Sequence, residues 1–306
     1  MQQYIIQRLM LSIPVLLGVT GIVFAILHLM PGDPVRIMAG ARASEERVQE
    51  IRLQLGLEQP VPLQYVRWLG KVVQGDLGTS IASKRSVAQL IGERLPFTLR
   101  LTLTSLLVSL VLGISLGVWA AIQHQRWPDY LISYSSLFWF SIPGFWLGLM
   151  LILVFGLWLR WTPISGQQGV YALVLPVLSL ALPQMGSLAR LVRTEMLEVM
   201  GEDFLRTAHA KGLHPQIIYY RHALRNALIP VTVLLFLGLP WLFGGSVVIE
   251  TIFAWPGLGR MMYQALLQKD FPVVQGLLLI FALITVLANL MSDMATTLLD
   301  PRIAQA

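Results

Sequence analysis

The chain carries a polar, basic stretch, Glu202-Asp-Phe-Leu-Arg-Thr-Ala-His-Ala-Lys-Gly-Leu213, between two groups of hydrophobic runs. Asp203 is predicted to cap a short helix, and Glu202 is also favourable beside the positive end of the helix dipole. Gly212 can adopt the left-handed conformation that ends a helix, and Pro215 suits the first turn of a second helix. A solvated loop needs no such order, so the stretch is predicted to be a docking surface for a partner protein.

Small side chains are expected to matter on this docking surface, because Ala208 and Ala210 would let another protein approach the helix backbone. From Pro215 an amphipathic helix leads into the next hydrophobic run, so a push on the surface could be carried into the membrane helices. The alternative, a helix lying on anionic lipid, explains the arginines but not the ordered cap, small residues and glycine. The residues predicted to contact the partner are Asp203, Phe204, Leu205, Arg206, Thr207, Ala208, His209, Lys211, Gly212 and Leu213.

Composition places the chain in a bilayer. Of its 306 residues, 56% are hydrophobic and 12% are charged, and the mean hydropathy is +0.68. The surface of a soluble globule cannot accommodate this excess, so an all-α integral membrane protein is predicted. The net charge of +6 comes from basic residues that fall largely in loops, so no nucleic-acid binding is expected. The absence of cysteine excludes disulfides and thiolate metal sites, and no metal site is predicted.

Apolar runs of the length needed to cross about 30 Å of hydrocarbon recur along the chain. The first is too long for the core of a signal peptide, so it is predicted to remain as a span. Residues 1–306 are therefore predicted to form a single transmembrane domain with an extracytoplasmic insertion (31–96), a cytoplasmic coupling segment (190–227) and an extracytoplasmic loop (250–272). The six predicted spans cover residues 9–29, 97–122, 131–159, 171–189, 228–249 and 273–298.

Basic residues in the short loops predict the orientation. One side carries nine and the other three, which places both termini and the coupling segment in the cytoplasm. The long insertion crosses regardless of its charge, and two small amphipathic helices are predicted there, one opening at Ser44 and one after Pro60. They could cap the bundle or dock an external partner. The nine are Arg8, Arg126, Arg190, Arg193, Arg206, Lys211, Arg221, Arg225 and Arg302, and the three are Arg160, Arg260 and Lys269.

The stretch Gly113-Ile-Ser-Leu-Gly117 matches the G-x-S-x-G pattern of serine hydrolases. That chemistry needs a histidine base at membrane depth, but His124 lies on the cytoplasmic flank of the span. His28, near the outer end of the first span, lacks an evident orienting acid. Gly113 and Gly117 are therefore interpreted as a small-xxx-small patch where another helix comes close, as are Gly144 and Gly148.

Polar residues inside spans are costly, which makes Asn289, Asp293 and Glu250 candidates for a role. Asn289 and Asp293 share a helix face and are predicted to hydrogen-bond to each other or to a neighbouring helix, as structural groups rather than a proton relay. No G-x-x-x-x-G-K-[ST] motif occurs, so ATP energy would have to come from another subunit. The chain is accordingly predicted to be no enzyme and to bind no cofactor itself.

Several motifs together resemble the permease subunits of the peptide/nickel class of bacterial ATP-binding-cassette importers. The family's coupling motif reads Glu-Ala-Ala, three residues, Gly; here Arg206-Thr207-Ala208 takes the first three places and Gly212 the glycine. His209 stands where many relatives carry arginine and the acidic first residue is absent, so no particular salt bridge to the ATPase is inferred. Further matching motifs are Met30-Pro-Gly-Asp-Pro34, Gly75-Asp-Leu-Gly78, Ser141-Ile-Pro143, Arg221-His-Ala-Leu-Arg-Asn-Ala-Leu-Ile-Pro230, Glu250-Thr-Ile-Phe-Ala-Trp-Pro-Gly-Leu-Gly259 and Asp300-Pro-Arg302.

The resemblance is to the first permease of the pair in dipeptide, glutathione and nickel importers. It implies a six-helix type I importer transmembrane domain, with a helical extracytoplasmic insertion between the first two spans, in the bacterial inner (plasma) membrane and surrounded by lipid. Implied partners are a second homologous permease in a heterodimer, two ATPase subunits that hold ATP and Mg, and an extracytoplasmic substrate-binding protein. The implied cargo is a small peptide-like solute, with nickel or a metal chelate as the alternative. A secondary transporter or channel working without an ATPase is the other function considered, and its inverted repeats and midplane helix breaks are not evident in the sequence.

Overall fold

The computed structural model describes residues 2–29, 35–36, 44–54, 58–163, 166 and 169–299, and its regular structure in these ranges is helical apart from an isolated antiparallel bridge between Thr79 and Ser86. The motifs at residues 30–34 and 300–302 lie outside the described residues. The α-helices are α1 (Gln2–Leu29), α3 (Glu45–Gln54), α4 (Val61–Val73), α5 (Val87–Ile122), α6 (Trp127–Ser141), α7 (Gly144–Leu151), α8 (Val174–Met200), α9 (Asp203–Ala210), α10 (Pro215–Ile217), α11 (Leu224–Ile252), α12 (Leu258–Leu267) and α13 (Phe271–Leu299).

Four helical stretches of the described chain are long and apolar enough to cross a membrane: Val87–Ile122, Tyr171–Met200, Pro215–Ile252 and Phe271–Ala295. A further candidate is the pair Trp127–Ser141 and Gly144–Trp158, and α1 contributes the shorter apolar stretch Met10–Ala25. The chain is therefore a multi-pass membrane protein by the length and composition of its helices.

The run at 131–159, predicted as one continuous span, is bent by 97° between α6 and the stretch Gly144–Trp158. The bend lies at Ile142 and Pro143, where the backbone is extended, with ψ values of 125° and 130°. Proline has no N–H and disfavours a helical conformation at the preceding residue, which explains why the helix stops at Ser141. The predicted span at 171–189 is shorter than the observed helix, because α8 continues as a helix to Met200.

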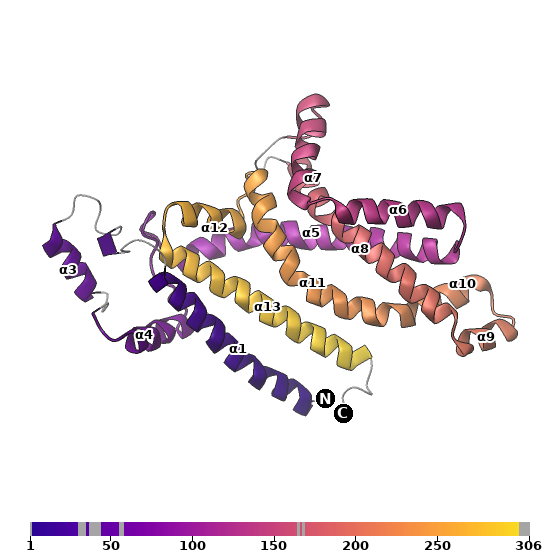
Figure 1. Ribbon diagram of the computed structural model, residues 1–306, viewed down its shortest axis with the longest axis horizontal. Helices are drawn as coiled ribbons and strands as arrows, with labels where there is room; N and C mark the ends of the chain where they lie inside the picture. Colours follow the sequence, from indigo (N-terminus) through magenta and orange to yellow (C-terminus); the bar gives the residue numbers. More distant parts are fainter. Residues whose placement is uncertain are drawn as a thin grey trace.

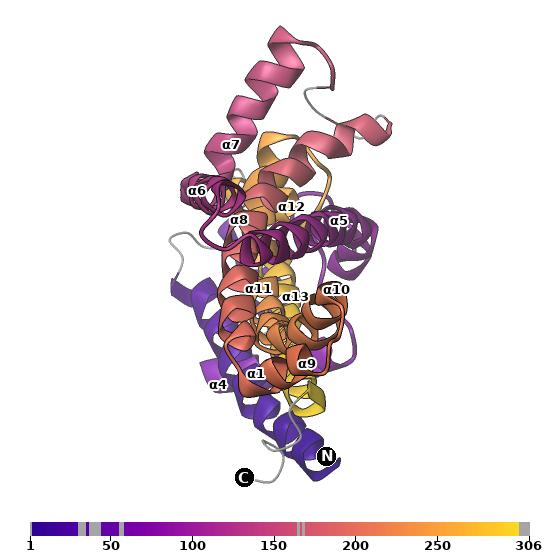
Figure 2. The same ribbon diagram turned by 90° about the vertical axis from the view of Figure 1, so that its right-hand side faces the viewer.

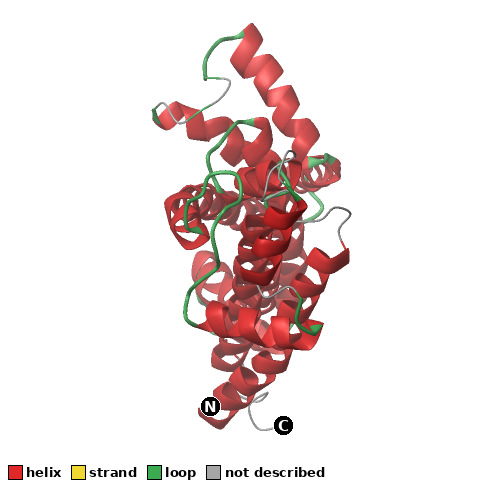
Figure 3. Ribbon diagram, turned by 90° about the vertical axis from the view of Figure 1, so that its left-hand side faces the viewer, coloured by secondary structure: helices red, strands yellow, loops and turns green. Residues whose placement is uncertain are grey.

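The helices form an elongated bundle in which α5 and α6 pack along α8, α11 packs along both α8 and α13, and α1 lies beside α13 (Figure 1). The outer helices α3, α4 and α12 lie toward one end, whereas α9 and α10 lie at the other (Figure 1). Figure 2 looks onto the end that carries α9 and α10. Seen from the opposite side, the described elements are helices joined by loops (Figure 3). The predicted docking surface thus lies at one end of the bundle.

Close packing of α5 on α8 depends on the absence of side chains at two glycines. A Cβ atom on Gly113 would lie 2.9 Å from Leu188 Cβ, and one on Gly117 would lie 2.6 Å from the carbonyl oxygen of Ala189. Both distances are shorter than real Cβ contacts, so only glycine permits this approach. The pattern Gly113–Gly117 therefore lies at a helix contact.

The second glycine pair lies on α7, beside α8. A Cβ atom on Gly148 would lie 3.2 Å from the ring of Phe253 and 3.3 Å from Ser179 Oγ, whereas one on Gly144 would make an ordinary contact of 3.4 Å with the carbonyl oxygen of Ser179. Gly148 is thus the more tightly packed of the two.

Of the two helices predicted in the insertion, which are α3 and α4 in the structure, α4 packs on α1. Tyr65 Oη lies 2.8 Å from Thr20 Oγ1, and the rings of Tyr65 and Phe24 meet edge to face with centroids 5.4 Å apart. This contact agrees with the bundle-capping role for α4, and the docking of an external partner stays a prediction.

Candidate functional site

The helix α9 begins at Asp203, and Glu202 occupies the capping position with extended backbone (φ −73°, ψ 148°) and no side-chain cap hydrogen bond. Asp203, predicted as the cap, is instead the first helical residue. Its Oδ1 accepts a hydrogen bond from Arg206 Nη1 at 3.0 Å, and both side chains are exposed. Asp203 therefore favours the helix through the dipole and this surface pair rather than by capping it.

Two residues on one face of α9 hold it against the bundle. Leu205 is 1% exposed and Ala208 is 7% exposed, and both join a buried cluster that includes Met196 of α8 and Ile218. The prediction that Ala208 opens the backbone to another protein is therefore wrong, because its three-residue spacing from Leu205 turns it inward. The exposed residues of the predicted docking surface are Asp203, Phe204, Arg206, Thr207, His209, Ala210, Lys211, Gly212 and Leu213.

The stop after α9 has the predicted geometry. Gly212 has φ +73°, and its N–H donates to the carbonyl oxygen of His209 at 2.9 Å. The helix α10 begins at Pro215, and a π-helical turn, Ile218–Ala223, joins it to α11. Pro215–Ile252 is consequently one helical rod, which begins after the short connection that follows α9.

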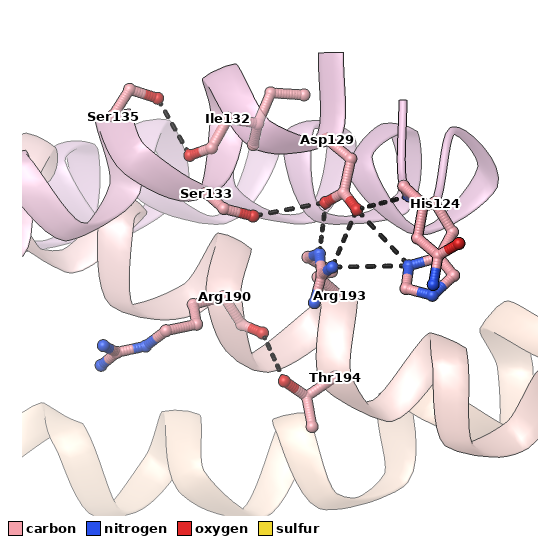
Figure 4. A network of polar contacts seen from close by, with 9 residues as sticks. His124, Asp129, Ile132, Ser133, Ser135, Arg190, Arg193 and Thr194 are labelled. Carbon is pink, nitrogen blue, oxygen red and sulfur yellow. Dashed lines mark hydrogen bonds and ion pairs between the residues drawn. The ribbon is translucent and has the colours of Figure 1, made fainter. Parts of the chain in front are cut away.

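Beside this surface, a buried carboxylate joins α6 to α8 (Figure 4). Asp129 is 1% exposed and accepts hydrogen bonds from Arg193 Nη2 at 2.8 Å, from the Gln125 N–H at 3.0 Å and from Ser133 Oγ at 3.3 Å. His124 Nδ1 lies 3.4 Å from the same carboxylate. Arg193, counted as a loop residue in the sequence, is thus a helical residue whose charge is neutralised by Asp129.

A cavity of about 500 Å³ lies between α5, α8 and α11. Its α8 wall carries a polar stripe consisting of Gln184, Ser187, Arg190 and Thr194, and the facing walls carry mainly leucines together with Trp241. None of these residues was predicted to line a translocation path, and Arg190, counted as a loop residue in the sequence, lies in α8. The sequence does contain a pattern for the stripe, because spacings of three, three and four residues place these polar side chains on one helix face.

At the other end of α11, Glu250 is completely buried. Thr98 Oγ1 of α5 donates to Glu250 Oε1 at 2.7 Å, and the backbone N–H of Arg260 in α12 donates to Oε2 at 3.1 Å. The Leu258 N–H donates in turn to Thr98 Oγ1 at 2.8 Å. Glu250 therefore ties three helices together, which is a structural role.

The two polar residues of α13 do not form the predicted pair. Asp293 Oδ2 lies 3.3 Å from Arg8 Nη1 of α1, while the side chain of Asn289 is exposed. Asp293 thus bonds to a neighbouring helix, the other arrangement considered.

Comparisons with known proteins cover both parts of the chain. The family model described as "Binding-protein-dependent transport system inner membrane component" matches residues 113–305, and the one described as "Binding-prot-dependent transport system membrane comp, N-term" matches residues 1–102. The oligopeptide transport system permease protein AppB of Bacillus subtilis (strain 168) is 40% identical over 314 residues, covering 99% of each chain. The glutathione transport system permease protein GsiC of Escherichia coli O6:H1 is 40% identical over 303 residues, also covering 99% of each chain.

Among solved structures, the fold is similar to a chain of the inward-facing MetNI methionine ABC transporter. The TM-score is 0.60 at 21% identity, and the match covers 69% of this chain and 97% of that chain. At this identity the likeness supports the all-α importer fold alone.

Proposed function

Because the chain belongs to the family of binding-protein-dependent transport system inner membrane components, we propose that it forms the path by which a small peptide-like solute enters a bacterial cell. The chain is a permease subunit of an ATP-binding-cassette importer, like its relatives AppB and GsiC. Those relatives are named for oligopeptide and glutathione transport, which supports a peptide-like cargo here.

The observation that carries this function is the construction of α9. Leu205 and Ala208 fix one face of the helix to the bundle, while Phe204, Thr207 and Lys211 remain exposed. A docking helix needs this division, since a partner can move the bundle only by pressing on an element that is itself anchored. We assign the exposed face to one of two ATPase subunits, which bind ATP and Mg.

The same geometry gives a route for the force. A push on α9 reaches the rod Pro215–Ile252, whose residues Leu234, Gly238 and Trp241 line the cavity. Tilting this rod against α8 would open the cavity alternately to the two sides of the membrane, because each state is stabilised by different contacts with the ATPases.

The remaining partners follow from this arrangement. A second homologous permease would complete the path as a heterodimer, and an extracytoplasmic substrate-binding protein would deliver the cargo near α3, α4 and α12. In this orientation α9 and both termini face the cytoplasm, as the basic residues of the short loops favour.

Affinity purification of the tagged chain from its native cells in mild detergent tests the function. We expect an ATPase with a Walker motif to co-purify, and uptake of radiolabelled dialanine to be lost when the chain is deleted. Purified chain that alone moves dialanine down an ion gradient would identify a secondary transporter instead. If deletion of the chain abolished uptake of labelled nickel but not of dialanine, the cargo would be nickel rather than a peptide.

A further inference from the structure

The polar stripe of α8 runs from the middle of that helix toward Met200, with Gln184 and Ser187 half-buried and Arg190 and Thr194 exposed to the open side of the cavity. The cavity that it lines is also bounded by Leu106 and Ser109 of α5 and by Gly238 of α11, all near the middle of their helices. Polar residues are costly at such depth and are retained where they face water or a passing solute. The stripe therefore marks the side of the cavity that a polar solute would contact.

Arg190 gives this stripe a permanent positive charge. Its guanidinium lies 4.8 Å from the centroid of the Phe140 ring of α6, a residue that does not itself line the cavity, and within the described ranges no carboxylate forms an ion pair with Arg190. Arg193, one turn away, is neutralised by Asp129, and Figure 4 shows the two arginine side chains pointing in different directions. No acidic residue is found among the described residues that line the cavity. The cavity is consequently electropositive.

We propose that the guanidinium of Arg190 binds the carboxylate of a solute during its passage, and that Gln184 and Ser187 hydrogen-bond to the solute's amide groups. The inference rests on the proposed function and assigns its substrate class: small solutes with a free carboxylate. A cavity of about 500 Å³ is in the size range of small-molecule sites. Guanidinium and carboxylate match in geometry and charge, and the open, hydrated setting keeps the binding weak enough for release.

The natural absence of cysteine allows a direct test on the full chain. Ser187→Cys introduces one thiol into the stripe, and its reaction rates with anionic sulfonatoethyl and cationic trimethylammonioethyl methanethiosulfonate are measured by mass spectrometry. We expect Arg190→Gln to lower the ratio of the anionic to the cationic rate about tenfold, and Arg190→Lys to preserve it, because one nearby unit charge is lost or kept.

Ser83→Cys, on the exposed outer segment, is the matched control and should show the same ratio with or without Arg190. An unchanged ratio at position 187 after Arg190→Gln would overturn the assignment of Arg190. A thiol at position 187 that reacts with neither reagent would overturn the hydrated cavity.

Transport by the complete importer separates this inference from the proposed function. Arg190→Gln should reduce the dialanine uptake rate at low concentration about tenfold, with the ATPase still co-purifying. Arg190→Lys should remain within about threefold of the native rate, because it keeps the charge but loses the bidentate geometry. Arg126→Gln, an exposed loop arginine, serves as the control and should transport normally.

The outcomes are distinguishable. If the native importer takes up dialanine and Arg190→Gln does so equally well, the carboxylate site is wrong while the function stands. If Arg190→Gln loses the ATPase, Arg190 is structural and the site is again wrong. If the native importer takes up no dialanine or other dipeptide, the peptide function fails, and the site proposed for its carboxylate fails with it.

Discussion

The two ends of the helical rod Pro215–Ile252 are built in opposite ways. At the end beside α12, which is the outer end in the proposed orientation, the buried Glu250 accepts hydrogen bonds from Thr98 of α5 and from the backbone N–H of Arg260 in α12. At the end beside α9, which is the inner end in the proposed orientation, Ile218, Ala223 and Ala227 of the rod are buried by apolar contact alone. The helix α9 itself buries only Leu205 and Ala208 in that cluster. The outer end, held by the hydrogen bonds of Glu250, is called the fixed frame below. The exposed face of α9, to which a partner would bind in the proposed function, is called the handle.

A second carboxylate reinforces the outer frame. Asp270, just before α13, accepts hydrogen bonds from Ser80 Oγ at 2.5 Å and from the N–H groups of Ile81 and Ala82 at 3.0 and 3.2 Å. These bonds tie the start of α13 to the turn that precedes α5. Rigidity at this end therefore comes from buried carboxylates whose hydrogen bonds are satisfied, in addition to apolar contact.

Replacing Glu250 should have the largest effect. Glu250→Ala leaves the hydroxyl of Thr98 and the N–H of Arg260 without their acceptor and opens a cavity between α5, α11 and α12. We expect the free energy of unfolding in detergent to fall by about 3 kcal/mol, measured by denaturant titration. Glu250→Gln keeps the volume and one acceptor oxygen, so it should lose about half as much. If both variants unfold like the native chain, the outer end is not a fixed frame.

Crowding the same region should have the next largest effect. A Cβ atom on Gly259 would lie 2.3 Å from Val247 Cα, so Gly259→Ala should force α12 away from α11. We expect the free energy of unfolding to fall by about 2 kcal/mol. Gly244→Ala, on α11, is the matched control, since nothing lies within 4 Å of its Cβ position. Equal stability of the two variants would show that the outer contact is loose.

At the inner end, Gly212→Val should cost about 1–2 kcal/mol, because Val avoids the left-handed conformation at φ +73°. Nothing lies within 4 Å of its Cβ position, so the cost is conformational and the bundle should still insert normally. Transport should fall much more than stability, since α9 would be displaced relative to α10. Gly212→Asn, which tolerates this conformation, should keep most of the transport. Normal uptake by the Val variant at normal expression would contradict the role of α9 as a handle.

Features that depend on local backbone chemistry could be predicted from the sequence. The left-handed conformation of Gly212 and the helix start at Pro215 follow from the residues themselves. The bend at Pro143 also had a local signal, but the apolar run continues on both sides and favoured a single span. Length and hydropathy give the number of apolar runs without giving the angle between their parts.

Features that depend on the packing of other helices could not be predicted. Whether Ala208 faces a partner or the bundle depends on where Met196 and Ile218 lie. The helix α8 continues past residue 189, and the charge of Arg193 in this continuation is neutralised by an ion pair with Asp129. Asp129 is more than sixty residues away in the chain, so the pair could not be predicted. For Arg190 the sequence already places the polar stripe on one helix face, but the cavity that this face lines depends on where α5 and α11 pack.

Phe204→Ala should have the smallest effect on stability, and it tests most directly whether the exposed face of α9 binds the ATPase. Phe204 and Leu205 are adjacent on α9, yet Phe204 is 45% exposed and Leu205 is 1% exposed. Leu205→Ala removes a buried side chain and should cost at least about 2 kcal/mol. Phe204→Ala should change the free energy of unfolding by less than about 0.5 kcal/mol, but it should abolish co-purification of the ATPase, because exposed aromatic side chains anchor protein interfaces. A Phe204→Ala chain that retains the ATPase and transports normally would place the docking contact elsewhere on the inner face, and the two ends of the rod would then differ in packing without differing in function.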